Sequence, residues 1–374
     1  MTSASSAPLD YRTAGVDYDL IDPLKVAAQR AAAATASHLA GHGCFEVEAS
    51  RGESAYVVDV GPFYLASIVE CLGTKALVAD EMQRLTGRSY YAAIAQDTIA
   101  MAVNDLITVG ATPLTVHAYW AAGGSDWFAD ASRSQALVEG WKAACDRCGI
   151  AWGGGETPAL GGIVVDGRID LAAACTGIVH PKQRLTLGRA LAGGDAIVLL
   201  ASSGIHANGV SLARALAAQL SDGWLTPLSA APDAPTLGAA LLAPTLLYPP
   251  VTEALHRAGV VPHYAANVTG HGWRKLMRHP AAWRYRIHNV PPVPPVLAFL
   301  RERLGQNAHD AYGTFNMGAG FALFVDRADV ARTLAAARAQ GIDAWEAGVV
   351  EEGPKEVVIE PLDVRFTADE LHLR

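Results

Sequence analysis

The stretch Ile94–Pro113, with the sequence IAQDTIAMAVNDLITVGATP, organises this chain. Its apolar side chains recur at helical spacing, Gly110 follows the last of them, and Pro113 stands where a helix cannot continue. We therefore predict a helix that ends at Gly110 and packs its apolar side against a core. Three polar residues lie seven and eight residues apart on the same side of this helix: Asp97, Asn104 and Asp105.

Polar side chains beside an apolar helix face cost free energy unless they are paired, bind a metal or open into a cleft. A carboxylate near the helix start and an Asn-Asp pair two turns later suit Mg²⁺ and phosphate oxygens. The alternative is that Asp97 satisfies amide groups of the helix and that Asn104 and Asp105 are solvated. The stretch alone leaves both interpretations open.

The composition is that of a soluble globular protein of one or two domains, with 374 residues, 51% hydrophobic and 18% charged. The formal charge of −8 disfavours a general nucleic-acid or anionic-membrane surface. We expect a disordered tail over residues 1–10, no leader, no transmembrane segment and a cytoplasmic location. The five cysteines are expected to be reduced, and Cys145 and Cys148 are interpreted as helix cysteines, with a redox or zinc role as the alternative.

Alternating helix and strand patterns divide the chain into two halves, with a boundary in the turn-rich segment 180–195. The first half is predicted to begin with a helix over Pro23–Ser37, capped by Asp22. In the second half, helices are predicted over Leu241–Tyr248 and Pro250–Ala258. The predicted strands are 44–49, 56–60, 65–70, 114–119, 171–179, 196–200, 321–325 and 347–350, with further helices at 131–149, 210–220, 274–277, 296–304 and 330–339.

Three loops combine glycine with polar residues. The first follows a strand that ends in Glu70 and reads Gly73-Thr74-Lys75 before a helix, which is the geometry of a phosphate site but not the Walker A pattern. The second reads Gly154-Gly155-Glu156-Thr157, where glycine admits a ligand close to the backbone and Glu156 supplies a hard oxygen. The alternative without a ligand is a glycine turn with a solvated glutamate.

The third loop opens the second half, between a strand and a helix, and reads Ser202-Ser203-Gly204-Ile205-His206-Ala207-Asn208-Gly209. His206 could orient a phosphate or move a proton near neutral pH. The alternative is a loop histidine that caps the following helix.

The order of these motifs is more informative than any one of them. Together with Tyr11-x-x-Ala14-Gly15-Val16-Asp17, Leu242-Ala243-Pro244-Thr245, Thr269-Gly270-x-Gly272 and Thr314-Phe315-Asn316-x-Gly318-x-Gly320, they resemble the aminoimidazole ribonucleotide (AIR) synthase family over roughly residues 11–350. The resemblance implies an α+β protein with two AIR-synthase-like domains, here 11–182 and 183–374. It also implies a homodimer in which N-terminal sheets form an inter-subunit barrel, and a C-terminal α/β sandwich.

The family reaction uses ATP and Mg²⁺ to activate the formamide oxygen of formylglycinamidine ribonucleotide, after which the imidazole ring closes. The resemblance therefore implies ATP and Mg²⁺ as cofactors and a phosphoribosyl amidine as substrate. It places Asp97 and Glu70 at the metal and Lys75 and Gly73 beside the triphosphate. By the same resemblance, Thr74, Asn104, Asp105, Gly154, Gly155, Glu156 and Thr157 support that cluster, Ser203, Gly204, His206 and Asn208 line the cleft, and Thr269 and Gly270 border the substrate pocket.

The departures from the family pattern gather near the expected chemistry. The family phosphate loop usually reads Gly-Thr-Asp-Gly-Val-Gly-Thr-Lys, whereas this chain has Ile68-Val-Glu-Cys-Leu-Gly-Thr-Lys75. The early loop, usually Gly-Gly-Phe-Gly, reads Gly43-Cys-Phe-Glu46, and Ala159-Leu-Gly-Gly162 replaces an acidic residue and Met-Pro-Gly. Glu46 could repel phosphate or replace a metal ligand.

These departures leave three hypotheses in ranked order. The first is a working AIR synthase, phosphoribosylformylglycinamidine cyclo-ligase. The second is a paralogous ATP-dependent small-molecule kinase or amide-activating enzyme on the same scaffold. The third is a non-catalytic nucleotide-binding dimer.

Overall fold

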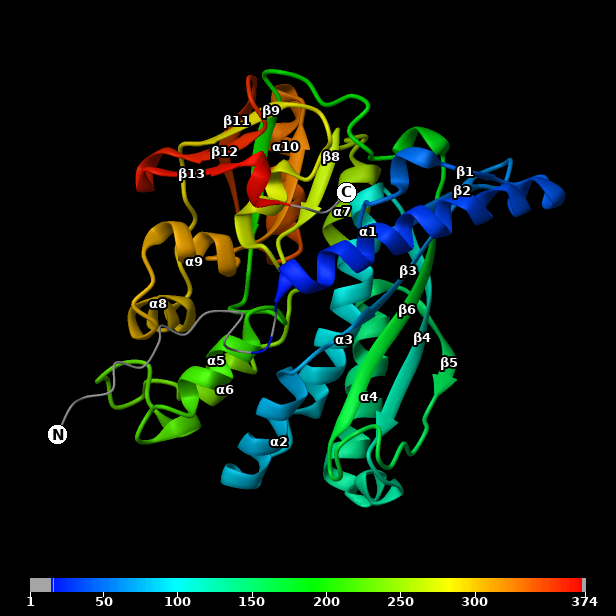
Figure 1. The fold of residues 1–374 in the computed structure, drawn as a ribbon. Helices are drawn as coiled ribbons and strands as arrows, with labels where there is room; N and C mark the ends of the chain where they lie inside the picture. The colour runs from blue at the N-terminus through cyan, green and yellow to red at the C-terminus, as the bar shows by residue number, and fades with distance from the viewer. Residues whose placement is uncertain (1–14, 16, 372–374) are drawn as a thin grey trace.

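The computed structural model describes residue 15 and residues 17–371. The expected tail over residues 1–10 and the start of the Tyr11–Asp17 motif lie outside the described residues. The described chain forms two mixed α/β halves, each built on its own sheet (Figure 1). The first sheet lies within residues 45–179 and the second within residues 196–367.

The first sheet has the strand order β1-β2-β3-β6-β4-β5. All neighbouring strands run antiparallel except β4 and β5, which are parallel. Buried and exposed residues alternate along β6, so one face of this sheet is covered and the other is open. The strands are β1 Phe45–Glu46, β2 Tyr56–Asp59, β3 Tyr64–Cys71, β4 Thr112–Ala122, β5 Ala151–Glu156 and β6 Ile169–Val179.

The helix predicted from the opening stretch is confirmed. It is α3, Tyr91–Leu106, and a 3₁₀ turn over Ile107–Val109 extends it to Gly110, whose φ of 80° ends it. A Cβ at Gly110 would lie 1.9 Å from the Arg184 carbonyl oxygen, so only glycine fits there. The other helices of this half are α1 Tyr18–Thr35, α2 Lys75–Thr86 and α4 Ala131–Cys148.

The second sheet has the order β13-β12-β9-β11-β7-β10-β8, and its β12–β9 pair is parallel while its other pairs are antiparallel. Its central strands are continuously apolar because both faces are covered. The strands are β7 Ala196–Ala201, β8 Tyr264–Asn267, β9 Trp283–Ile287, β10 Ala319–Val325, β11 Ala344–Glu352, β12 Glu356–Ile359 and β13 Val364–Thr367. The helices are α5 Val210–Ala217, α6 Leu237–Leu241, α7 Pro249–Arg257, α8 Pro295–Arg303, α9 Ala308–Thr314 and α10 Val330–Ala339.

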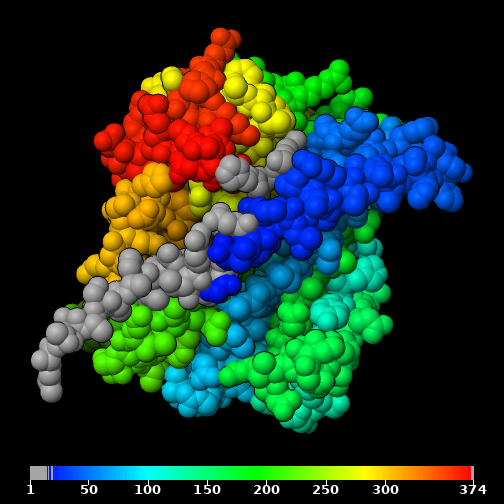
Figure 2. All heavy atoms as spheres, viewed as in Figure 1, coloured from blue at the N-terminus to red at the C-terminus, as the bar shows by residue number. Residues whose placement is uncertain are grey.

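Two predicted helices are wrong in ways that matter for the site. The first helix begins at Tyr18 rather than after Asp22, so Pro23 lies inside it. In Figure 2 this helix, coloured blue, crosses the molecule between the red C-terminal strands and the cyan α2. The segment predicted as a helix over Leu241–Tyr248 leaves α6 at Leu241 and has no regular structure from Pro244 to Tyr248. The strands β9, β12 and β13 and the helix α9 were not predicted.

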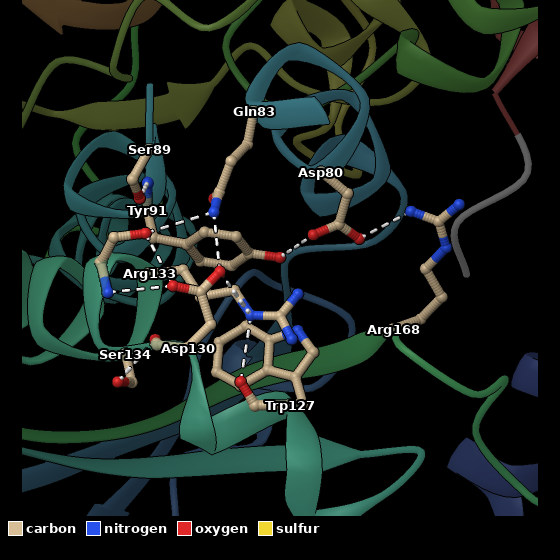
Figure 3. A network of polar contacts seen from close by, with 10 residues as sticks. Asp80, Gln83, Ser89, Tyr91, Trp127, Asp130, Arg133, Ser134 and Arg168 are labelled. Carbon is tan, nitrogen blue, oxygen red and sulfur yellow. Dashed lines mark hydrogen bonds and ion pairs between the residues drawn. The ribbon is translucent and has the colours of Figure 1, made fainter. Parts of the chain in front are cut away.

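A polar network fastens α2 to its neighbours (Figure 3). The Asp80 carboxylate accepts a hydrogen bond from the Tyr91 hydroxyl at 2.6 Å and pairs with Arg168 at 2.9 Å. Gln83 donates to Asp130 at 2.8 Å, and Asp130 caps α4. These contacts hold α2 against α3 and α4. They therefore also fix the position of the loop at Gly73, which leads into α2.

Candidate active site at the domain boundary

Asp97 and Lys75 form an ion pair that is completely buried. The Lys75 Nζ lies 2.8 Å from Asp97 Oδ2, and both side chains are 0% exposed. Asp97 Oδ1 also accepts hydrogen bonds from the Thr245 backbone N–H at 2.7 Å and from its hydroxyl at 2.6 Å. Burial raises the pKa of Asp97, and Lys75 and Thr245 oppose that rise. The two residues predicted beside metal and triphosphate therefore bind each other and the second domain.

Other polar side chains of α3 bind the same part of the second domain. Gln96 donates to the Thr245 carbonyl at 2.7 Å. Asn104 donates to the Leu246 carbonyl at 2.8 Å and accepts from the Tyr248 N–H at 3.0 Å. Neither of the two simple interpretations of this helix, amide capping or a solvated pair, describes Asp97 and Asn104. They satisfy the backbone of a distant segment.

Glu70 and Asp105 form a second, differently placed carboxylate pair. Burial, followed by the nearby charge of Asp105, raises the pKa of Glu70 to about 7. Asp105 is 6% exposed, and its Oδ1 accepts a hydrogen bond from Asn267 Nδ2 at 2.7 Å. A half-buried carboxylate next to a buried one is a favourable place for a cation.

The second domain brings a cation to this carboxylate pair. Lys275 is 8% exposed, and burial lowers its pKa to about 8 while the charges of Asp105 and Glu70 oppose the decrease. His271 precedes it in the left-handed region, with φ 69°. Burial, followed by the charge of Lys275, lowers the pKa of His271 to about 3, so its ring is neutral.

The predicted glycine turn faces this boundary from the first domain. Gly73 has φ 74° and leads into α2, and no other atom lies within 4 Å of the position that a Cβ would take. The Thr74 hydroxyl lies 3.2 Å from the hydroxyl of Ser211 on α5, across the boundary. The turn therefore places backbone N–H groups next to open space at the N-terminus of α2, where the helix dipole is positive.

The loop after β7 lies opposite. The Ser203 N–H donates to His206 Nε2 at 3.2 Å, and the Gly204 carbonyl accepts from Asn316 Nδ2 at 2.8 Å. Burial, followed by the charge of Lys75, lowers the pKa of His206 to about 3. His206 is therefore neutral at physiological pH. Its surroundings do not favour the predicted role in proton transfer near neutral pH. Asn208 contacts Met101 of α3 across the boundary.

Three other predicted groups lie elsewhere or already have partners. Gly154, Gly155 and Glu156 lie on the exposed edge strand β5, and Thr157 follows it. Glu46 forms an ion pair with Arg51, so its carboxylate has a partner within its own domain. Thr269 is buried in the turn before Gly272, and its carbonyl accepts the Gly272 N–H at 3.0 Å, while Gly270 is half-buried.

The cysteines are free thiols, as predicted. Burial raises the pKa of Cys145 to about 11 and that of Cys148 to about 12, which disfavours the reactive thiolate. Among residues 15 and 17–371, no three His, Cys, Asp or Glu side chains are grouped closely enough to hold a metal ion by themselves. None of the helices in the same residues combines the length and apolar character needed to cross a bilayer.

Three residues of this site were not among the predicted site residues: Thr245, Asn267 and Lys275. Asn267 ends the strand that lies two residues before the Thr269-Gly270-x-Gly272 motif, and that position was the available signal. Thr245 belongs to a quoted motif, but its partner Asp97 lies 148 residues away. Only the fold brings these groups together.

Comparison with protein families matches both halves of the chain. Residues 52–179 match the family described as AIR synthase related protein, N-terminal domain. Residues 192–360 match AIR synthase related protein, C-terminal domain. The two matched regions correspond to the two sheets.

Curated relatives match most of the chain in sequence, and a solved structure shares its fold. The chain is 34% identical over 79% of its length to a phosphoribosylformylglycinamidine cyclo-ligase of Parasynechococcus marenigrum, covering 83% of that protein. It is 32% identical over 96% of its length to one of Burkholderia cenocepacia, covering 100% of that protein. The fold resembles that of the hydrogenase maturation protein HypE in complex with ATP, with a TM-score of 0.57 at 17% identity over 82% of this chain and 84% of that one.

Proposed function

Since this chain belongs to the AIR synthase family, we propose that it is an ATP-dependent phosphoribosylformylglycinamidine cyclo-ligase of purine biosynthesis. It would convert formylglycinamidine ribonucleotide to aminoimidazole ribonucleotide, with release of ADP and phosphate. The structural observation that carries the proposal is the buried Asp105 carboxylate, which accepts a hydrogen bond from Asn267 of the second domain and whose charge acts on the half-buried Glu70 and on Lys275.

We propose that Glu70 and Asp105 hold the Mg²⁺ that accompanies ATP. Hard carboxylate oxygens suit Mg²⁺, which commonly binds one or two carboxylates and completes its coordination with water and phosphate oxygens. When bound, the metal would neutralise charge that develops on the phosphate oxygens. In this proposal Glu70 keeps its predicted role, and Asp105 takes the place first given to Asp97.

The residues around this pair have complementary tasks. We propose that the Gly73–Thr74 turn receives phosphate oxygens through backbone N–H groups at the start of α2, where space is open. Lys275 would neutralise phosphate charge from the second domain, and the neutral His271 would add no further positive charge there. The Ser203–Asn208 loop would close the opposite side of the cleft.

We also propose a homodimer formed through the open face of the first sheet. Val69 is 70% exposed and pairs with the exposed Ala174 on β6, and Tyr119 of β4 is 37% exposed. Figure 1 shows α3 and α4 on the other side of this sheet. An uncovered sheet face with apolar side chains is a natural surface for a second copy of the chain. Glu156 and Thr157, exposed beside that face, would then lie near the partner.

Growth of a purine-requiring bacterial strain that lacks its cyclo-ligase tests the proposed function. We expect the wild-type chain to restore growth without added purine. Asp105→Asn should fail to do so, while the exposed control Asp146→Asn should restore growth. Restoration by Asp105→Asn would remove Asp105 from the proposed metal site, and failure of the wild-type chain, when present in soluble form, would contradict the cyclo-ligase assignment.

A further inference from the structure

The connection between α6 and α7 is the feature that the proposed function does not use. Residues 243–248, here named the 243–248 segment, lack regular secondary structure between these helices, and Thr245, Leu247 and Tyr248 are buried. A buried segment outside helices and sheets must find other partners for its N–H and C=O groups. The partners found here come mainly from the first domain.

The contacts follow the segment residue by residue. Lys75 Nζ donates to the Ala243 carbonyl at 3.0 Å, and the Ser203 hydroxyl donates to the Pro244 carbonyl at 2.7 Å. Asp97 receives both the N–H and the hydroxyl of Thr245. The remaining contacts along the segment are those of Gln96 with the Thr245 carbonyl, and of Asn104 with the Leu246 carbonyl and the Tyr248 N–H.

Both ends of this arrangement lead to the candidate active site. Lys75 directly follows the Gly73–Thr74 turn, and its charge is close enough to His206 to lower the pKa of that ring. On the second-domain side, the Tyr248 hydroxyl donates to the Ala201 carbonyl at 2.7 Å, at the base of the loop that holds Ser203 and His206. The segment therefore lies between the two loops that the proposed function places around the phosphates.

We propose that Lys75, Gln96, Asp97 and Asn104 are positioning residues that hold the 243–248 segment, and that the segment sets the distance between the Gly73–Thr74 turn and the Ser203–Asn208 loop. This rests on the proposed function for the identity of the ligand, Mg·ATP. Small displacements of groups around a reacting phosphate reduce rates strongly, so a loosened segment lowers activity without removing any ligand-binding side chain.

Thr245→Val tests this role because it removes one hydroxyl and keeps the backbone and volume. Thr252→Val is the matched control, because Thr252 is also buried in the second domain but donates to Pro249 within its own helix. Thr245→Ser restores the hydroxyl. The measurements are Mg·ATP affinity by calorimetry, kcat and KM with formylglycinamidine ribonucleotide, and thermal unfolding of each full-length variant.

We expect Thr245→Val to lower Mg·ATP affinity and kcat/KM about tenfold, the loss of one hydrogen bond to a charged group. For Thr245→Ser and Thr252→Val, Mg·ATP affinity and kcat/KM should stay within about threefold of wild type. This should hold even if Thr252→Val lowers the unfolding temperature as much as Thr245→Val does. Wild-type binding and kinetics in Thr245→Val, with a lower unfolding temperature alone, would overturn the proposal.

A second variant and a second readout keep the test decisive. If Thr245→Val does not fold, Gln96→Met removes the donor to the Thr245 carbonyl and should give the same pattern, and wild-type Mg·ATP affinity in that variant would overturn the proposal. If wild-type protein binds Mg·ATP but does not turn over the purine substrate, the proposed function fails, while Mg·ATP affinity of the variants still decides the role of the segment.

Discussion

Asp97 and Asp105 lie on the same helix but in opposite surroundings. Asp97 is 0% exposed and has a cation, Lys75, as a partner, whereas Asp105 accepts a hydrogen bond from the neutral Asn267 and lies near the half-buried carboxylate of Glu70. The ion pair with Lys75 gives Asp97 a structural role. Charge repulsion in the second pair is relieved by a cation, which makes Asp105 and Glu70 the better candidates for metal binding.

The two aspartates should therefore respond differently to loss of charge. Asp97→Asn leaves Lys75 buried without a counter-charge and should lower the free energy of unfolding by about 3–5 kcal/mol. Glu70→Gln and Asp105→Asn should leave that free energy unchanged or higher and weaken Mg²⁺-dependent ATP binding at least about tenfold. Urea unfolding and calorimetry with and without Mg²⁺ measure both. A stable Asp97→Asn variant that has lost Mg²⁺ dependence would return the metal to Asp97.

His206 gives a prediction for acid stability. Its pKa is about 3 in the folded chain because of burial, against an ordinary value of 6.5. Between these values the unfolded chain binds a proton that the folded chain does not, so His206 makes the fold less stable as pH falls from 6.5 towards 3. Between pH 7 and pH 5 this contribution is about 2 kcal/mol.

His206→Asn should remove that part of the acid sensitivity, because asparagine cannot titrate there and tolerates the φ of 59° at this position. The measurement is the free energy of unfolding of both proteins at pH 5 and pH 7. An equal decrease in wild type and variant would show that His206 is not held neutral by the fold.

At the scale of elements, the sequence pattern within the stretch was enough to predict α3. The segments that pack around α3 come from distant parts of the sequence and could not be predicted in this way. Helical periodicity followed by Gly110 and Pro113 is complete within the sequence stretch itself, so α3 and its end were predictable. The 243–248 segment has the apolar composition of a helix, yet its backbone partners lie on α2 and α3. The pairing of Glu70 with Asp105 and the neutrality of His206 likewise depend on burial, which no short pattern reports.

The open face of the first sheet leads to a prediction at the same scale. Val69→Lys places a charge in the proposed dimer interface and should convert a dimer to a monomer in light scattering. Val138→Lys is the control, because Val138 is 43% exposed on α4, away from that face. A wild-type chain that is already monomeric, or a Val69→Lys variant that stays dimeric, would contradict the proposed interface.

At the scale of the whole molecule, the two domains meet through polar contacts at more than one place. Besides the 243–248 segment, Arg278 of the second domain donates to the Ser54 hydroxyl and to the Gly52 carbonyl, and Tyr264 donates to Glu53. These contacts hold the domain boundary, and with it the Glu70–Asp105 pair, in one arrangement. The loops Gly43–Glu46 and Ile68–Lys75, which differ from the family pattern, therefore lie in a pair of domains whose arrangement these contacts hold.

The most direct test of the cyclo-ligase assignment is ADP release by the purified chain with Mg·ATP, measured with and without formylglycinamidine ribonucleotide. We predict that the ribonucleotide raises ADP release well above the background rate and that one aminoimidazole ribonucleotide forms for each ADP. Mg·ATP binding with a turnover that does not respond to the ribonucleotide would contradict the assignment and favour a paralogous ATP-dependent enzyme. Absence of any stabilisation by Mg·ATP in a melting experiment would contradict it as well and favour a non-catalytic dimer.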